Sequence, residues 1–98
     1  MAMVKLAPAQ IKTALPAVPD WKQRGPTITC TRQFKDFAAA MKFVNAVARL
    51  AERNQHHPDI DIRWNKVTLT LSTHDAGGLT EKDFDLAGKC DRLAAANS

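Results

Sequence analysis

Two of the three histidines in this chain stand side by side, His56 and His57, directly before Pro58. Glu52 precedes His56 by four residues. An imidazole titrates near neutral pH, at about 6.5, so one ring can donate a proton while another accepts one. A turn held by Pro58 can splay both rings toward one pocket, and Glu52 can accept a hydrogen bond from an imidazole N–H and select its tautomer. These residues are candidates for acid–base chemistry.

The third histidine, His74, follows two stretches of alternating apolar and polar residues that are separated by Asn65-Lys66. A two-residue loop at Asn65-Lys66 predicts a β-hairpin with its apolar residues on one face. The expected pairs are Trp64 with Val67, Ile62 with Leu69, Ile60 with Leu71 and Asp59 with Ser72. This register brings His74 beside the His56-His57 turn and makes Trp64 a core residue at a strand end. Without His74, two exposed rings at a helix end are an equally good interpretation of the histidine pair.

Other kinds of site are disfavoured. Zinc sites built from histidine usually use separated spacings or add cysteines, whereas Cys30 and Cys90 lie far apart, so we expect no metal. Asp83 is most simply a helix-capping carboxylate, in the pattern Thr80-x-x-Asp83. No phosphate-binding glycine loop or dinucleotide fingerprint is present. We therefore expect acid–base chemistry without a nucleotide or redox cofactor.

The elements that must position these residues form one α+β domain over residues 1–98, with a loose arm at 1–7 and a frayed tail at 95–98. Periodicity and turn signals predict a helix over 8–15, strands at 21–24 and 27–34, and a helix over 35–54. The hairpin follows, and a last helix begins at Glu81. The order α-β-β-α-β-β-α is typical of a two-layer fold, in which a four-stranded antiparallel sheet has helices on one face.

The long helix over 35–54 has two apolar stripes. The first stripe is Phe37, Met41, Val44, Ala48 and Ala51, and the second is Phe43, Val47 and Leu50. A helix that packs only on its own sheet needs one stripe. We therefore expect the second stripe to be buried against another subunit, or against a different partner protein.

Composition excludes several classes of protein. The net charge is +4, but the basic residues are scattered and the chain has two Trp, four Phe and no Tyr, so nucleic-acid binding is disfavoured. No apolar run approaches membrane-spanning length, and residues 1–10 do not resemble a signal peptide. Two distant cysteines favour free thiols in a reducing cytoplasm.

One set of residues resembles the signature of the pterin-4a-carbinolamine dehydratases. The motif is Glu52, His56-His57-Pro58, Trp64, His74 and Asp83, at the spacings in which they stand here. Trp21, Phe34-Lys35-Asp36-Phe37, Leu71-Ser72-Thr73-His74 and Gly78-Leu79-Thr80 are also similar to that family, so the resemblance covers about residues 8 to 94.

The resemblance implies dehydration of a 4a-hydroxytetrahydropterin to the quinonoid dihydropterin, without a cofactor. His56 and His74 would be the principal acid–base pair, with the acid and the base unassigned, and His57 would hold and polarise the substrate. Glu52 would orient the histidines. The family pattern also implies further pterin-site residues, namely Gln55, Ser72, Thr73 and Asp75, and supporting residues, namely Pro58, Trp64 and Asp83. Gln55 departs from an acidic residue that some relatives have before the histidine pair.

The resemblance also implies partners. Family members form homodimers and homotetramers, and they accompany pterin-dependent aromatic amino acid hydroxylases. In animals the family also has a second role, as a dimerisation cofactor of a homeodomain transcription factor. The alternative function for this chain is therefore a protein-interaction module that binds through the stripe of Phe43, Val47 and Leu50. Such a module would tolerate loss of the histidines, and their joint presence with Glu52 favours the enzyme.

Overall fold

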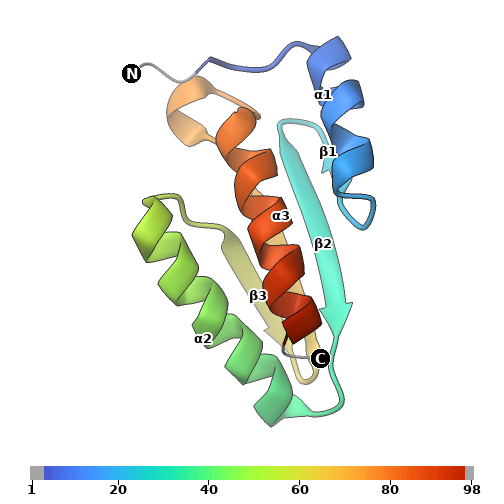
Figure 1. The fold of residues 1–98 in the computed structure, drawn as a ribbon, viewed down its shortest axis with the longest axis vertical. Helices are drawn as coiled ribbons and strands as arrows, with labels where there is room; N and C mark the ends of the chain where they lie inside the picture. Colours follow the sequence, from blue (N-terminus) through green and yellow to red (C-terminus); the bar gives the residue numbers. More distant parts are fainter. Residues whose placement is uncertain (1–3, 97–98) are drawn as a thin grey trace.

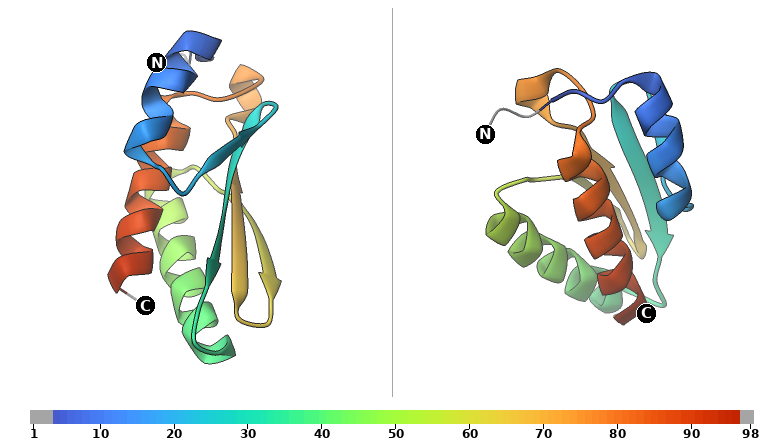
Figure 2. Two further views of the ribbon diagram at one scale, coloured as in Figure 1. Left: turned by 90° about the vertical axis from the view of Figure 1, so that its right-hand side faces the viewer. Right: turned by 45° about the horizontal axis from the view of Figure 1, so that its top comes forward.

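A computed structural model of the chain describes residues 4–96 and contains three α-helices, four strands and two 3₁₀ turns among them (Figure 1). The helices are α1 (Pro8–Ala14), α2 (Phe37–Asn54) and α3 (Glu81–Ala96); the 3₁₀ turns are η1 (Leu15–Ala17) and η2 (His74–Ala76); and the strands are β1 (Lys22–Arg24), β2 (Thr27–Gln33), β3 (Asp59–Arg63) and β4 (Lys66–Leu71). The predicted order and fold class are confirmed. The strands form one antiparallel sheet in the order β1-β2-β4-β3. Edge-on, the three helices lie on one side of it (Figure 2).

The sheet separates an apolar face from a polar face because side chains alternate along each strand. Ile28 of β2 lies opposite Leu71 of β4, and Cys30 lies opposite Leu69; all four are buried beneath the helices. The open face carries threonine pairs, with Thr31 Oγ1 2.8 Å from Thr68 Oγ1. The hydrophobic core therefore lies between the sheet and the helices.

The register of the β3–β4 hairpin differs from the prediction by two residues. Ile62 pairs with Val67, and Ile60 pairs with Leu69, so the loop is Trp64-Asn65 and not Asn65-Lys66. Trp64 sits in the turn with φ +52° and its surface is 68% exposed, so its prediction as a core residue was wrong. Asn65 is buried in its place: its side chain donates to Phe34 O at 2.7 Å, and its own carbonyl accepts from Phe34 N. These two hydrogen bonds to Phe34, which lies between β2 and α2, favour the observed turn.

The prediction for the two stripes of α2 was also wrong. Phe43, Val47 and Leu50, expected to meet a partner, are buried within this chain, with Phe43 0% exposed. The Phe43 ring packs against that of Phe34, with the ring centroids 5.0 Å apart and the ring planes tilted by 32°. The first stripe is only partly buried: Val44 and Ala51 are covered, whereas Phe37 is 49% exposed and Ala48 is exposed. The interaction module proposed from the second stripe therefore has no free surface there.

Both chain ends extend beyond the described residues, since 1–3 of the predicted arm and 97–98 of the predicted tail lie outside them. Within the arm, Leu6 N donates to Leu79 O at 2.8 Å, which ties the N-terminal segment to the loop before α3. None of the helices in the described part of the chain is long and apolar enough to cross a membrane.

Candidate functional site

The C-terminal end of α2 determines how the histidine pair leaves the helix. Gln55 adopts a left-handed conformation, with φ 50°. This lets Gln55 N donate to Glu52 O at 3.3 Å and His56 N donate to Ala51 O at 3.1 Å, which satisfies two carbonyls of the last turn. The chain then turns toward β3 and passes beside the N-terminal turns of α3 (Figure 1). The backbone of His56 is consequently hydrogen-bonded to the last turn of α2, and His57 follows it directly.

His56 faces inward and contacts Asp83 of α3. Its Nε2 lies 2.5 Å from Asp83 Oδ1, although the two residues are 27 positions apart. The His56 side chain is 10% exposed and that of Asp83 is 0% exposed. Asp83 Oδ2 accepts from Thr73 Oγ1 and from Thr80 N, each at 2.9 Å. The buried carboxylate is therefore fully hydrogen-bonded, as a buried charge must be.

His57 points the other way and contacts Glu52 through Nε2. Both side chains are largely exposed, so this pair is screened by water. The carboxylate expected to orient a histidine thus contacts His57, while His56 takes Asp83. Adjacent residues of an extended segment point to opposite sides, which explains why one carboxylate does not hold both rings.

His74 opens the 3₁₀ turn η2 and is fully exposed. Its Nδ1 lies 4.0 Å from Asp75 Oδ1, and Asp75 is also fully exposed. In the described part of the chain His74 has no hydrogen bond to His56 or His57. Its neighbour Thr73 links this turn to the histidine pair, because Thr73 Oγ1 donates to the Asp83 carboxylate, which also contacts His56.

The other predicted site residues lie in different parts of the fold. Ser72 Oγ donates to Pro26 O at 2.9 Å, toward the β1–β2 turn. Gln55 is exposed at the helix end and Pro58 is half-buried before β3. Trp64 occupies the turn of the β3–β4 hairpin, at the opposite end of β3 from the histidines. The structure thus gathers a cluster of Glu52, His56, His57, Thr73 and Asp83. His74 follows Thr73 directly in the chain, and its side chain is fully exposed.

Sequence analysis did not place the Thr80 side chain beside this cluster. The capping pattern is confirmed, since Asp83 accepts from Thr80 N and Thr80 Oγ1 accepts from Lys82 N at 3.2 Å. The Thr80 hydroxyl is also 2.7 Å from Thr73 Oγ1. The capping motif was visible in the sequence, but the partners of its two side chains come from residues 56 and 73, which no local pattern connects to it.

Chemically, the cluster offers an imidazole backed by a buried carboxylate next to a second, solvent-accessible imidazole. This combination suits proton transfer. No group of three or more metal-ligating side chains is found within residues 4–96. Cys30 and Cys90 are free and buried, and burial raises the pKa of both thiols, that of Cys90 to about 12. Such thiols stay protonated at neutral pH and are poor nucleophiles.

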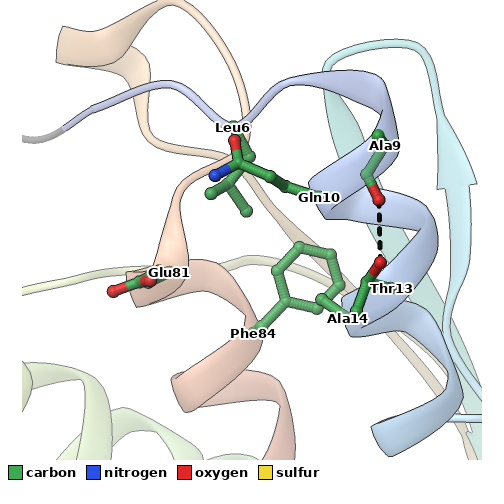
Figure 3. Close-up of a pocket in the computed structure, with 7 residues that line it drawn as sticks. All are labelled: Leu6, Ala9, Gln10, Thr13, Ala14, Glu81 and Phe84. Carbon is green, nitrogen blue, oxygen red and sulfur yellow. Dashed lines mark hydrogen bonds between the residues drawn. The ribbon is translucent and has the colours of Figure 1, made fainter.

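A cavity of about 420 Å³ lies elsewhere, between α1 and α3 (Figure 3). Its wall is formed by Leu6, Ala9, Gln10, Thr13, Ala14, Glu81 and Phe84. Thr13 Oγ1 is already engaged with Ala9 O, and no histidine reaches this wall. The histidines are therefore not in this cavity, whose one ionisable lining residue in the described part of the chain is Glu81.

The chain is similar to known proteins along most of its length. The family model described as "Pterin 4 alpha carbinolamine dehydratase" matches residues 4–93. A protein of Acidobacterium capsulatum named "Putative pterin-4-alpha-carbinolamine dehydratase" is 55% identical over 91 residues, which are 93% of this chain and 99% of that one. A protein of Nocardia farcinica with the same name is 56% identical over 91% of this chain and 94% of its own length.

Two solved structures are also similar. The structure described as a transcriptional coactivator/pterin dehydratase from Brucella melitensis superimposes with a TM-score of 0.88, is 35% identical, and matches over 92% of this chain and 98% of its own. A pterin dehydratase-like protein, described as a RuBisCO assembly factor in the alpha-carboxysome, superimposes with a TM-score of 0.63 at 27% identity, over 76% of this chain and 86% of its own.

Proposed function

Because this chain belongs to the pterin 4 alpha carbinolamine dehydratase family, we propose that it dehydrates a 4a-hydroxytetrahydropterin to the quinonoid dihydropterin by histidine acid–base catalysis. The observation that carries the proposal is the loop after α2, where two adjacent imidazoles each contact a carboxylate. Such pairs hold imidazoles in defined orientations, which proton transfer requires.

The reaction loses one molecule of water. A base takes the proton from N5, an acid protonates the hydroxyl on C4a, and the C4a–O bond breaks as the C4a=N5 double bond forms. No electrons are gained or lost overall, so the chemistry needs no redox cofactor. In this proposal one of His56 and His74 is the base and the other is the acid. Both return to their starting protonation states when the proton taken from N5 is passed from the base to the acid.

The other residues of the loops would hold the pterin. His57, oriented by Glu52, is accessible to a ligand and would polarise the substrate. Backbone and side chains of Gln55, Ser72, Thr73 and Asp75 would line the pterin site. The full exposure of His74 supports a role at a solvent-facing mouth of the site, where the departing water leaves.

The test is the rate of dehydration of freshly generated 4a-hydroxytetrahydropterin, followed by absorbance of the quinonoid product against the uncatalysed rate. We expect wild type to accelerate the reaction, and His56→Ala and His74→Ala each to lose about 10²-fold or more. Lys12→Ala, an exposed change on α1, is the matched control and should keep full activity. A folded wild-type protein that only matches the uncatalysed rate would refute the proposal.

We also propose that the chain forms a homodimer or homotetramer. Strand β3 pairs only with β4 in the described sheet, so its outer edge offers backbone hydrogen-bonding groups. Ile62 and Trp64 are exposed along this hairpin, where an uncovered edge would favour pairing with another strand. Ile62→Lys should lower the mass measured by sedimentation toward 10.8 kDa. A wild-type mass of 10.8 kDa would exclude the oligomer.

In the cell, the proposed role is recycling of the pterin for an aromatic amino acid hydroxylase in the cytoplasm. Co-incubation with such a hydroxylase should raise its sustained rate when 4a-hydroxytetrahydropterin accumulates. His56→Ala, which removes the chemistry, is the control, and an equal effect of this variant would contradict the coupling.

A second candidate function is partner binding without chemistry. Two solved relatives are described as a coactivator and an assembly factor, and Phe37 of α2 exposes half its surface. A binding module would tolerate His56→Ala, whereas the enzyme would not. Wild-type protein without dehydratase activity would favour this second candidate.

A further inference from the structure

The hydrogen bonds around Asp83 have one consistent direction. An ionised carboxylate only accepts, so His56 must donate from Nε2–H to Asp83 Oδ1. On the other oxygen, Thr73 donates its hydroxyl and Thr80 donates its backbone N–H. Since the Thr73 hydroxyl has one hydrogen, the Thr80 hydroxyl must donate to Thr73 Oγ1, and it accepts in turn from Lys82 N. Each donor in this series of hydrogen bonds has an acceptor.

The direction determines the tautomer of His56. In the neutral ring only one nitrogen has a proton, and here it is Nε2. Nδ1 then carries the free lone pair, and it has no hydrogen bond in the described part of the chain. Every buried side-chain nitrogen or oxygen among residues 4–96 has a partner, so Nδ1 must be reached by solvent. The small exposed part of the ring therefore includes the nitrogen that is able to accept a proton.

We propose that Asp83 is a positioning residue which, with Thr73 and Thr80, keeps the His56 proton on Nε2 so that Nδ1 is the nitrogen presented to the substrate. This inference rests on the proposed function and adds to it the reacting atom of His56 and the groups that select it. Asp83 itself is 0% exposed and does not meet the substrate. It acts through the two residues that it holds in place, His56 and Thr73.

The same carboxylate also sets the spacing of the two catalytic regions. One oxygen holds the loop after α2 and the other holds Thr73, whose next residue is His74. Both loops are thus anchored to the first turn of α3, an element fixed in the core through Leu86 and Cys90. Anchoring at one buried point lets the substrate meet His56 and His74 at a defined separation, which lowers the entropy cost of the reaction.

The substitution Asp83→Asn gives a specific expectation. Two donors, the Thr73 hydroxyl and the Thr80 N–H, converge on one side of the group, so the amide oxygen must take that side. The amide NH₂ then faces His56 and donates to Nε2. His56 must accept there, and its proton moves to Nδ1. The nitrogen that faced the substrate with a lone pair now carries a hydrogen, so this ring begins in the wrong tautomer.

The experiment reads the tautomer directly by long-range ¹H–¹⁵N NMR of His56, at a pH where the ring is neutral, together with kcat and KM for 4a-hydroxytetrahydropterin. Wild type should have the proton on Nε2. Asp83→Asn should have it on Nδ1 and lose about 10²-fold in kcat, with a smaller change in KM because no substrate contact is removed. Asp85→Asn, an exposed change on the same helix that removes the same charge, should alter neither reading.

A wild-type His56 with its proton on Nδ1 would overturn the inference, and this reading needs no variant to fold. A folded Asp83→Asn that keeps wild-type kcat would also overturn it. The proposed function fails separately: wild type with Nε2–H but without dehydratase activity would refute the enzyme and leave the positioning by Asp83 intact.

Discussion

Replacing Thr73 by valine removes one hydroxyl from the buried network while keeping the shape of the side chain. That hydroxyl donates to Asp83 Oδ2 at 2.9 Å and lies 2.7 Å from Thr80 Oγ1. Valine can make neither contact. Asp83 loses one of its donors, and the Thr80 hydroxyl is left without an acceptor in a site that water does not reach.

The expected cost follows from these two losses. A hydrogen bond to a charged group is worth about 1.5–3 kcal/mol, and a buried polar group left unsatisfied costs about 1–3 kcal/mol. The two terms share one site and do not add fully, so we expect Thr73→Val to lower the free energy of unfolding by about 2–4 kcal/mol. Against a total of about 5–15 kcal/mol for a small domain, this is a large fraction.

The chain offers a matched control in Thr31. Its hydroxyl also contacts a threonine hydroxyl, Thr68 Oγ1 at 2.8 Å, but on the exposed face of the sheet. Water can replace that partner, so Thr31→Val should change the free energy of unfolding by less than about 0.5 kcal/mol.

Urea denaturation of both variants and wild type, at two protein concentrations to correct for assembly, measures the difference. Equal stabilities of the two variants, with unchanged m-values, would refute the view that burial of the Asp83 network decides the cost.

The remaining predictions concern the core, an exposed ion pair and a buried thiol. Phe43→Ala should lower the free energy of unfolding by about 3–5 kcal/mol, and Phe37→Ala, on the half-exposed stripe of the same helix, by much less; equal losses in urea denaturation would contradict the assignment of the stripes. Glu52→Ala should cost less than about 1 kcal/mol in the same assay because its pair with His57 is exposed, and a larger loss would mean that the pair is structural. The Cys90 thiol has its pKa raised from 9.0 to about 12, chiefly by burial, so the folded chain keeps a proton that the unfolded chain releases. Stability should therefore fall as pH rises from 9.0 toward 12, and Cys90→Ala should reduce that slope; an unchanged slope would refute the assignment.

Local patterns in the sequence were sufficient for the element order and for several boundaries. The start of α3 followed from Thr80 and Asp83, because a capping box needs only residues three apart. The antiparallel sheet with one apolar face followed from alternation along β2 and β4, since side chains of a strand alternate whatever their partner is. The family motif likewise consists of residue types at fixed spacings.

Local sequence patterns did not determine the register of the β3–β4 hairpin or the buried face of α2. A hairpin loop at Trp64-Asn65 and one at Asn65-Lys66 differ by two residues in pairing, and a shift of two keeps every side chain on the same face. The burial of Asn65 against Phe34, a contact made only in the folded chain, favours the first of these two loops. In the same way, both stripes of α2 were apolar enough for a core, and the packing of α2 on the sheet and α3 decided that Phe43 is inside.

The sequence by itself determined which groups are available for acid–base chemistry, because His56, His57, His74 and Glu52 are recognisable by type and spacing. Only the tertiary structure decided which carboxylate each imidazole meets. Glu52 is near both rings along the chain, yet it contacts His57, while His56 meets Asp83 from another helix. The reason is physical: a buried carboxylate needs several donors from different directions, and only folding brings His56, Thr73 and Thr80 around one aspartate.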